Sequence, residues 1–565
     1  MPILSRLALI AGLAFSTPVA AQISVPLQIE FSGAYLAGRQ AAAMGDHREA
    51  ARYFLEVLQA DPGNYALRGA AMQALAALGD WDRASELAAG HPTEIGGREF
   101  ADLILQVDRI RRGDLAAAAA AAAEDRGAGP LVDPMMQGWL FLGEGDMRRA
   151  TATFEAIINS NSPVAGLVPY QLALARASVG DFEGANAIFA GEVFGPLQIS
   201  TRGLQAHAQI LVQLDRQADA LALLDAALDQ NGDQGLRELR DDIAANPTRP
   251  YDFITTPQQG MAEVLFSLAR ALGTEAGTTL PLIYARAAYA IDPGHIHAQL
   301  LAADILSEAD QLAMAEETYR QIPRDNPLFV DAELGRSEAL FQMGRTDAAV
   351  EVLNALVRDY PLISAVHTAL GDVQRRLENY EEAVAAYTDA LALVDQTRER
   401  SWFLFYVRGI SNDSLDNWTA AEADFRQALE LRPDQPQVLN YLGYSLVEQR
   451  RNLDEALDMI ERAVAGRPES GYIVDSLGWV LYRLDRFDEA VAPMERAVEL
   501  EPNDPVINDH LGDVYWMVGR TREAEFQWSR ALSFEPEPAE AERIRRKLEL
   551  GLDAVLAEEA ESVQQ

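Results

Sequence analysis

The chain has 565 residues, more than one hydrophobic core holds, because compact cores stop growing at about 250–300 residues. It contains no cysteine, which excludes disulfide scaffolds, thiolate metal sites, cysteine nucleophiles and lipid attachment through cysteine. Its 86 acidic and 47 basic residues give a net charge of −39, and Lys547 is the only lysine. Such a surface repels phosphate backbones and anionic lipid, so nucleic acid and membrane surfaces are poor partners.

Residues 1–21 have the pattern of a secretory signal peptide. Arg6 precedes an apolar run from Leu7 to Phe15, and small residues end at Ala21. The apolar run is far shorter than the ~20 residues that a membrane-spanning helix needs, and no later stretch reaches that length. The sequence therefore predicts cleavage before Gln22 and a mature protein in the periplasm. The alternative is an N-terminal core helix.

Small residues recur along the rest of the chain, mostly every 34 or 35 residues, with one gap of 61. Twelve residues after most members of this first column stands an alanine of a second column, and four residues later comes a large apolar residue, as in Ala524 and Trp528. A small residue is expected where two helices approach closely, so each unit is predicted to be a helix, a tight turn and a second helix. Twelve of the fourteen residues in the first column are Gly, Ala or Ser, and the column consists of Gly38, Met72, Gln106, Gly138, Ala173, Ala208, Ala269, Ala303, Ser337, Gly371, Gly409, Gly443, Gly478 and Gly512.

The repeats divide the mature chain into two arrays. We predict an array of degenerate repeats over residues 22–228 and a more regular array over 260–536. Residues 229–259 hold the breakers Asn246-Pro247 and Thr256-Pro257, which favour a hinge. A degenerate repeat is the alternative there, because the gap is close to two periods. Residues 537–565 are predicted to form a capping helix and tail, since a terminal cap needs an outer face that meets water.

The two columns resemble the tetratricopeptide repeat. The last unit shows the pattern best, with Leu511-Gly512 and Tyr515 in its first helix, Ala524 and Trp528 in its second, and a closing proline. The resemblance implies an all-α fold, an alpha-alpha superhelix of about 12–14 helix-turn-helix repeats. In such a solenoid, stacked neighbours share a continuous core and present a concave inner surface.

No motif of an enzyme is present. The chain lacks a nucleophile elbow, a phosphate-binding loop, a dinucleotide-binding loop and an H-E-x-x-H motif. Carboxylate pairs such as Glu381-Glu382 are expected on solvated faces. His295 and His297 form a close pair without a third ligand nearby, and we expect them at the surface. We therefore predict a non-enzymatic protein with no cofactor and no metal site.

The last three full repeats carry the candidate binding site. At 100° per residue, the positions three before, one after and four after Gly443, Gly478 and Gly512 share a helix face about 120° from the packing face. In tetratricopeptide repeats this face lines the concave groove, so the resemblance implies an aromatic and acidic groove that binds a protein segment and selects basic partners. The alternative is that the aromatic residues pack against the first helix of the neighbouring repeat. The predicted site residues are Asn440, Tyr444, Asp475, Trp479, Tyr482, Asp509, Asp513 and Trp516.

The segments 439–444, 475–479 and 510–516 look like the C-terminal signature of a group of proteobacterial envelope proteins. That group includes a lipoprotein adaptor that delivers cell-wall hydrolases to a periplasmic carboxyl-terminal processing protease. The resemblance implies an interaction scaffold of the cell envelope, with the protease and the hydrolases as partners if the adaptor role carries over. The chain departs from that lipoprotein in having no lipid-anchor cysteine. The alternative is a structural or assembly subunit of a secretion, pilus or polysaccharide-export machine.

Overall fold

The computed structural model describes residues 29–563 except 93–97, 125, 231–233 and 274–276. The predicted signal peptide, residues 1–21, lies outside the described residues. Within them, every regular element is a helix, from α2 to α32, with two short 3₁₀ turns at Ala165–Leu167 and Glu399–Ser401. The all-α prediction is confirmed.

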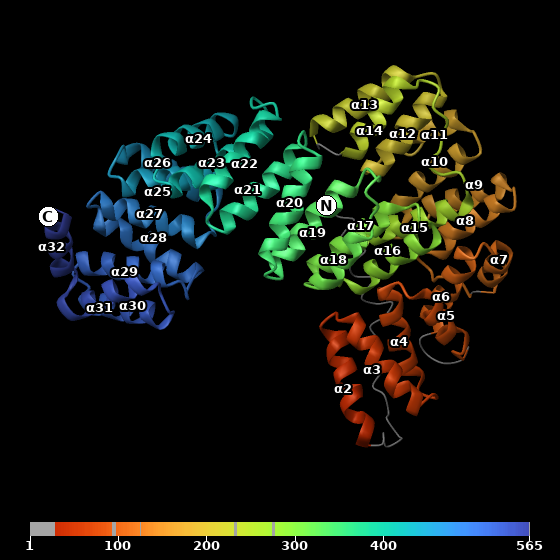
Figure 1. The fold of residues 1–565 in the computed structure, drawn as a ribbon, viewed down its shortest axis with the longest axis horizontal. Coiled ribbons are helices and arrows are strands. Elements are labelled where there is room, and N and C mark those ends of the chain that lie inside the picture. The colour runs from red at the N-terminus through yellow and green to blue at the C-terminus, as the bar shows by residue number, and fades with distance from the viewer. Residues whose placement is uncertain (1–28, 93–97, 125, 231–233, 274–276, 564–565) are drawn as a thin grey trace. The chain divides into compact units, whose positions relative to one another are not determined.

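Fourteen helix pairs contain most of these elements, and in each pair the first helix carries a member of the first small column (Figure 1). Six pairs precede α14 (Gln234–Ala245). They are α2 (Ile29–Ala43) with α3 (His47–Ala60), α4 (Tyr65–Leu78) with α5 (Trp81–Ala89), α6 (Arg98–Arg111) with α7 (Leu115–Ala123), α8 (Asp133–Gly143) with α9 (Met147–Ile158), α10 (Val168–Ser178) with α11 (Phe182–Phe189), and α12 (Thr201–Gln213) with α13 (Gln217–Gln230).

Eight pairs follow α14, and two further helices end the chain. The pairs are α15 (Pro257–Leu272) with α16 (Thr279–Ile291), α17 (Ile296–Glu308) with α18 (Leu312–Arg320), α19 (Phe329–Gln342) with α20 (Thr346–Asp359), α21 (Ser364–Arg376) with α22 (Tyr380–Ala392), α23 (Trp402–Ser414) with α24 (Trp418–Leu431), α25 (Pro436–Glu448) with α26 (Leu453–Gly466), α27 (Gly471–Arg483) with α28 (Phe487–Leu500), and α29 (Pro505–Met517) with α30 (Thr521–Ser533). The last two helices are α31 (Pro538–Leu550) and α32 (Leu552–Val563).

The small column and the large apolar residues meet inside the pairs whose first-column residue is glycine. A Cβ atom added to Gly38 would lie 2.8 Å from the ring of Phe54, and one added to Gly138 would lie 2.5 Å from the ring of Phe154. Real Cβ atoms do not approach other atoms so closely, so a larger residue would force the helices apart. The first column is therefore small because the large side chain of the second helix enters the pair there.

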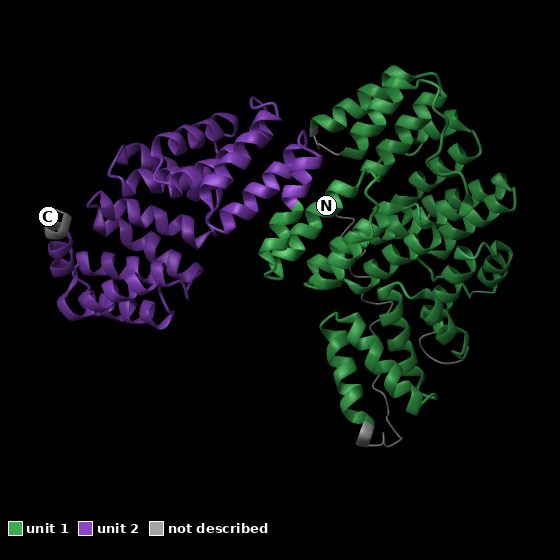
Figure 2. Ribbon diagram, in the orientation of Figure 1, with its two compact units in different colours: residues 1–352 green, residues 353–565 purple. Residues whose placement is uncertain are grey.

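The chain forms two compact units, unit 1 over residues 1–352 and unit 2 over residues 353–565 (Figure 2). The division falls within α20 and not at 229–259, where the sequence analysis placed the boundary between the arrays. The large apolar core of unit 1 ends at Ala332, and that of unit 2 begins at Ala383. Leu362 lies between these two cores in the sequence, and its side chain is exposed.

The described residues 234–256 form helix α14 and a return segment inside unit 1, so this part of the chain holds one helix and not the helix pair of a repeat. On α14, Leu236 and Ile243 pack against α12 and α13 in a small separate core. The chain then runs back without regular structure to α15. Two hydrogen bonds hold this return, from Gln213 Nε2 to the Arg249 carbonyl at 2.6 Å and from the Asp252 amide to Gln209 Oε1 at 3.1 Å.

The return places α15 and α16 against the first helices of the N-terminal pairs. Helix α15 packs on α8 and α10, and α16 packs on α4 and α6 (Figure 1). The approach of α15 to α8 is close, since a Cβ atom added to Gly260 would collide with the indole of Trp139. Gln171 links the two sides, because it accepts a hydrogen bond from Trp139 Nε1 at 3.0 Å and donates one to Ser267 Oγ at 3.4 Å. The first helices α4, α6, α8 and α10 are thus packed against α15 and α16 of the same chain.

A buried ionic cluster fastens α15 in this position. Glu263 accepts hydrogen bonds from Tyr170 of α10 at 2.9 Å, from Arg202 of α12 at 2.8 Å and from His295 Nε2 at 3.0 Å. Burial would raise the pKa of Glu263, but the charge of Arg202 and the bond from His295 lower it well below its usual range. The carboxylate therefore stays ionised. A buried charge is tolerated when an opposite charge and hydrogen bonds compensate for the loss of water.

The prediction that His295 and His297 lie at the surface is wrong for His295. His295 is buried and caps α17, where its Nδ1 accepts the Ala298 amide at 3.2 Å. Burial and the nearby Arg202 lower the pKa of His295, so the ring is neutral and its Nε2 carries the proton that Glu263 accepts. His297 is half-buried, with Nδ1 3.4 Å from Arg202 Nη1.

The C-terminal cap is a pair of helices and not the single predicted helix. The break is at Gly551, whose φ of 83° lies in the left-handed region that suits glycine. A Cβ atom there would also lie 2.7 Å from the ring of Trp516. The close packing at this corner explains why the charged segment bends instead of continuing.

Candidate protein-binding site

The concave stripe of unit 2 is defined by four positions in the first helix of each pair. They stand six and three residues before the small-column residue and one and four residues after it, so they share one helix face. The predicted site residues occupy the last three of these positions in α25, α27 and α29. The position six before the small residue holds Ala365, Phe403, Gln437, Tyr472 and Val506.

Trp479 lies in a stack of rings between two adjacent first helices. Its ring centroid is 4.8 Å from that of Tyr482 at an interplanar angle of 7°, and 4.0 Å from that of His510 on α29 at 15°. Its Nε1 donates a hydrogen bond to Glu448 of α25 at 2.7 Å. Only 8% of Trp479 is exposed. The indole therefore joins α25, α27 and α29 and presents little area to a partner.

Asp475 is buried and also joins α27 to α29, through His510. His510 Nδ1 lies 3.1 Å from both carboxylate oxygens of Asp475. Burial would lower the pKa of His510, but the charge of Asp475 and its hydrogen bond raise it above the usual value. The histidine is therefore charged over a wider pH range than a free imidazole, and Asp475 is occupied as its counterion.

Asp509 and Asp513 share the only lysine of the chain. Lys547 of α31 places its Nζ 2.7 Å from Asp509 Oδ2 and 2.6 Å from Asp513 Oδ1, and its side chain is fully buried. Asp513 also accepts a hydrogen bond from Trp528 Nε1 at 2.9 Å. Burial and the neighbouring Asp513 raise the pKa of Asp509, against the opposing charge of Lys547. These carboxylates anchor the cap and do not form an open acidic surface.

The remaining predicted residues are half-buried. Trp516 donates from Nε1 to Asp553 of α32 at 3.1 Å, so the cap partly covers it. Asn440, Tyr444 and Tyr482 line the stripe at intermediate exposure. The Oδ1 atom of Asn440 is buried and has no hydrogen-bond partner within the described part of the chain.

The structure thus corrects the predicted exposure of Asp475, Trp479, Asp509 and Asp513. All four pack against the next first helix or against the cap, as in the alternative interpretation of the stripe. The physical reason is that adjacent first helices contact one another along this face, so that a ring or carboxylate there reaches its neighbour before it reaches solvent.

The accessible part of the stripe is the position that the sequence analysis missed. Phe403 is 41% exposed, Tyr472 is 59% exposed and Val506 is 37% exposed. They occupy equivalent places in the first turns of α23, α27 and α29. The repeat spacing could have indicated this position, because a residue six before the small-column residue lies on the same helix face as the predicted site residues.

In unit 1 the corresponding positions of α6 and α8 are buried. On α6, Leu103, Val107 and Ile110 of this stripe are buried, as are Met135 and Trp139 on α8. A first helix that is apolar on its stripe as well as on its packing face is typical of a helix covered on both sides. Here the covering elements are α15 and α16.

Comparison with known proteins fits the repeat architecture. Residues 300–362, 334–398, 406–471 and 448–505 match one model of the tetratricopeptide repeat, and residues 41–105 match another. The chain carries tetratricopeptide repeats. The TPR repeat-containing protein PA4667 of Pseudomonas aeruginosa is 27% identical over 201 residues, which are 34% of this chain and 31% of that protein. The match therefore spans about a third of the length of that relative.

Solved structures with similar helix pairs include several repeat proteins. The Cut9-Hcn1 hetero-tetramer of APC/C matches at 16% identity over 80% of this chain and 96% of that chain, with a TM-score of 0.39. A tetratricopeptide repeat protein of Parabacteroides merdae matches at 16% identity over 45% of this chain and 98% of that chain, with a TM-score of 0.37. The tetratricopeptide repeat is a scaffold for protein–protein interaction, and that coarse function applies to this chain.

Two kinds of feature are absent from the described residues, a membrane-spanning helix and a cluster of metal ligands. No described helix is both long and apolar enough to span a membrane. Among the same residues, no three histidine or acidic side chains are grouped so that they could hold a metal ion.

Proposed function

We propose that the protein is a non-enzymatic scaffold that binds a segment of a partner protein along the concave stripe of unit 2. The observation that carries this proposal is the contrast between the units. The stripe of unit 2 keeps Phe403, Tyr472 and Val506 exposed in one register, whereas the stripes of α6 and α8 in unit 1 are covered by α16 and α15.

The chemistry of the stripe suits a peptide segment. Exposed apolar residues are common singly, but a row of them at equivalent positions is typical of an interaction surface. Tyr and Phe supply large contact areas at little conformational cost, as interface anchors do.

The carboxylates of the stripe contribute less to the selection of a basic partner than the sequence suggested. Lys547 neutralises Asp509 and Asp513, and His510 neutralises Asp475. Selection for basic partners then rests on the overall net charge of −39 and not on these three carboxylates.

Two anchor substitutions test the site. We expect Phe403→Ser combined with Tyr472→Ser to weaken binding by about 2–4 kcal/mol, because anchors of this type carry most of an interface's energy. Binding is measured by calorimetry with the partner that the intact chain captures from periplasmic extract. The matched control combines Phe526→Ser and Leu550→Ser, which remove similarly exposed side chains from α30 and α31. Equal affinity of the anchor variant and the intact chain would show that the stripe is not the site.

The finer role that we propose is an adaptor of the cell envelope that presents substrates to a periplasmic carboxyl-terminal processing protease. The signal-peptide pattern of residues 1–21 and the signature-like segments of α25, α27 and α29 support it. The second candidate is a structural or assembly subunit of a secretion, pilus or polysaccharide-export machine. Capture of a processing protease with wall hydrolases favours the adaptor, and capture of export or pilus subunits favours the second role.

A further inference from the structure

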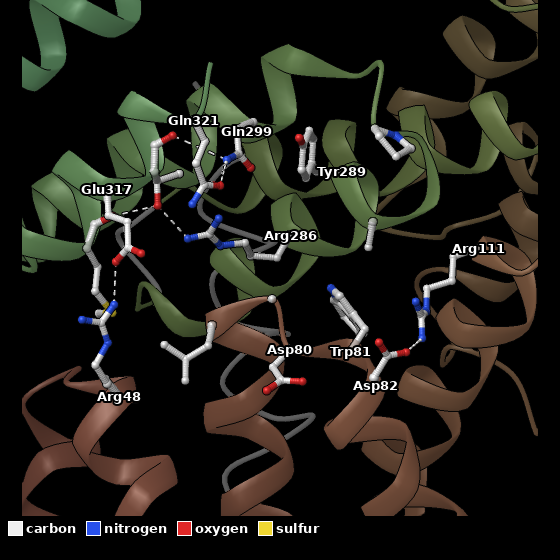
Figure 3. A pocket seen from close by; sticks show the side chains of 16 residues that line it. Arg48, Asp80, Trp81, Asp82, Arg111, Arg286, Tyr289, Gln299, Glu317 and Gln321 are labelled. Atoms are coloured by element: carbon white, nitrogen blue, oxygen red, sulfur yellow. Dashed lines mark hydrogen bonds and ion pairs between the residues drawn. The ribbon is translucent and has the colours of Figure 1, made fainter. Parts of the chain in front are cut away.

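Unit 1 contains a cavity of about 400 Å³ where the returning helices meet the first two repeats (Figure 3). One wall comes from the turn between α4 and α5 and from Arg111 at the end of α6. The opposite wall comes from α16, α17 and α18. The cavity therefore exists because the chain folds back on itself, and its size is in the range of small-molecule sites.

Three buried polar atoms around this cavity have no hydrogen-bond partner in the described part of the chain. Two are donors, the indole Nε1 of Trp81 and the Nε of Arg286. The third is an acceptor, the Oε1 of Gln299, whose amide nitrogen already donates to Gln321 at 2.9 Å. Trp81 is 4% exposed and Gln299 is 1% exposed. A buried polar atom without a partner loses the hydrogen bond that it makes to water in the unfolded chain, so three such atoms around one cavity favour a ligand that supplies the partners.

One cation of the cavity forms no ion pair with a carboxylate within the described part of the chain. Each lining carboxylate has its own arginine: Glu317 pairs with Arg48 at 2.6 Å, Asp80 with Arg83 at 3.3 Å, and Asp82 with Arg111.

Arg286, by contrast, bonds only to the hydroxyl of Thr318 at 2.8 Å among the described residues. Burial lowers the pKa of Arg286 to about 10 against the opposing charge of Glu317, and Arg286 is still charged at neutral pH. A cation in this position attracts an anion, and its planar fork matches a carboxylate.

Apolar and aromatic side chains complete the walls. Figure 3 shows the indole of Trp81 directed toward the side of the cavity from which Arg286 and Tyr289 project. Pro293 and Met314 also line it. A few convergent polar groups among apolar walls are typical of a site for a small organic ligand.

We propose that this cavity binds a small carboxylic acid that also carries a hydrogen-bond donor, such as a hydroxy acid or an amino acid. Its carboxylate accepts hydrogen bonds from Arg286 Nε and Trp81 Nε1. Its hydroxyl or amino group donates to Gln299 Oε1. The site is distinct from the stripe of unit 2 and lies wholly within unit 1.

Calorimetric titration of the full chain with L-lactate, L-3-phenyllactate, L-glutamate and L-phenylalanine tests the proposal. We expect saturable binding of at least one of these probes, and no binding of L-lactamide, which lacks the carboxylate. Failure of all four acids to bind at millimolar concentration would overturn the proposal. Equal binding of L-lactate and L-lactamide would overturn it as well.

Substitutions then locate the site. Trp81→Phe keeps the ring and removes only the N–H, so we expect at least tenfold weaker binding of the probe with unchanged helix content. Arg286→Met should abolish binding. The control is Trp418→Phe, because Trp418 Nε1 is also buried and unpaired but does not line the cavity. Binding that is unchanged in Trp81→Phe, or equally reduced in Trp418→Phe, would contradict the assignment.

Discussion

Replacing Lys547 with Met is expected to destabilise the C-terminal end of unit 2 by about 3–5 kcal/mol, because breaking a buried ion pair leaves an uncompensated charge. The lysine is fully buried between Asp509 and Asp513. Without it the two carboxylates repel each other, and Arg543, at 3.7 Å from both, compensates only in part. Hydrogen exchange is the suitable measurement, since a repeat array does not unfold as a single two-state unit.

The control for Lys547 is Arg545→Met on the same helix. Arg545 is exposed and paired with Glu542 at 3.4 Å, and exposed pairs contribute about 0–1 kcal/mol. The triple variant Lys547→Met, Asp509→Asn, Asp513→Asn should recover part of the loss, since it removes the unpaired charges. Equal exchange rates in the Lys547 and Arg545 variants would show that the buried cluster does not hold the cap.

Trp528→Ala should cost about 3–5 kcal/mol at the last full repeat, as large-to-small changes in a packed core do. Trp528 is fully buried against Gly512, and its Nε1 bonds to Asp513. Because repeats couple mainly to their neighbours, the loss of protection should be confined to the end of unit 2. It is checked by hydrogen exchange over residues 505–550. Equal loosening around Phe54 of α3 would contradict a neighbour-coupled array.

The repeat phase could be predicted because it depends on contacts within one helix pair. Gly138 and Phe154 lie sixteen residues apart, and the turn between their helices fixes how they meet. Local spacing therefore carries this information. The burial of Trp528 and the helix face that carries the stripe were predicted from the same local spacing.

Contacts between distant segments could not be predicted in this way. Nothing near Lys547 in the sequence indicates Asp509 as its partner, and nothing near Glu263 indicates Tyr170 or Arg202. One feature of the sequence did indicate that first helices of unit 1 are covered on both sides, namely the apolar stripe of α6 and α8. The prediction that Trp479 is exposed is wrong. Helix periodicity gives the direction of a side chain but not the distance to the neighbouring helix.

An engineered disulfide between α8 and α15 tests most directly whether first helices of the N-terminal pairs are covered by the chain itself. A Cβ atom added to Gly143 would lie 3.7 Å from the Cβ of Pro257, within the range that a disulfide spans. The natural chain has no cysteine, so Gly143→Cys with Pro257→Cys gives an unambiguous readout by thiol labelling and mass. The control is Gly143→Cys with Gly166→Cys, because a Cβ at Gly166 meets no atom within 4 Å. We predict nearly complete oxidation of the first pair under a mild oxidant and none of the control pair. Free thiols in both pairs would contradict the packing of α15 on α8 and with it the assignment of partner binding to unit 2.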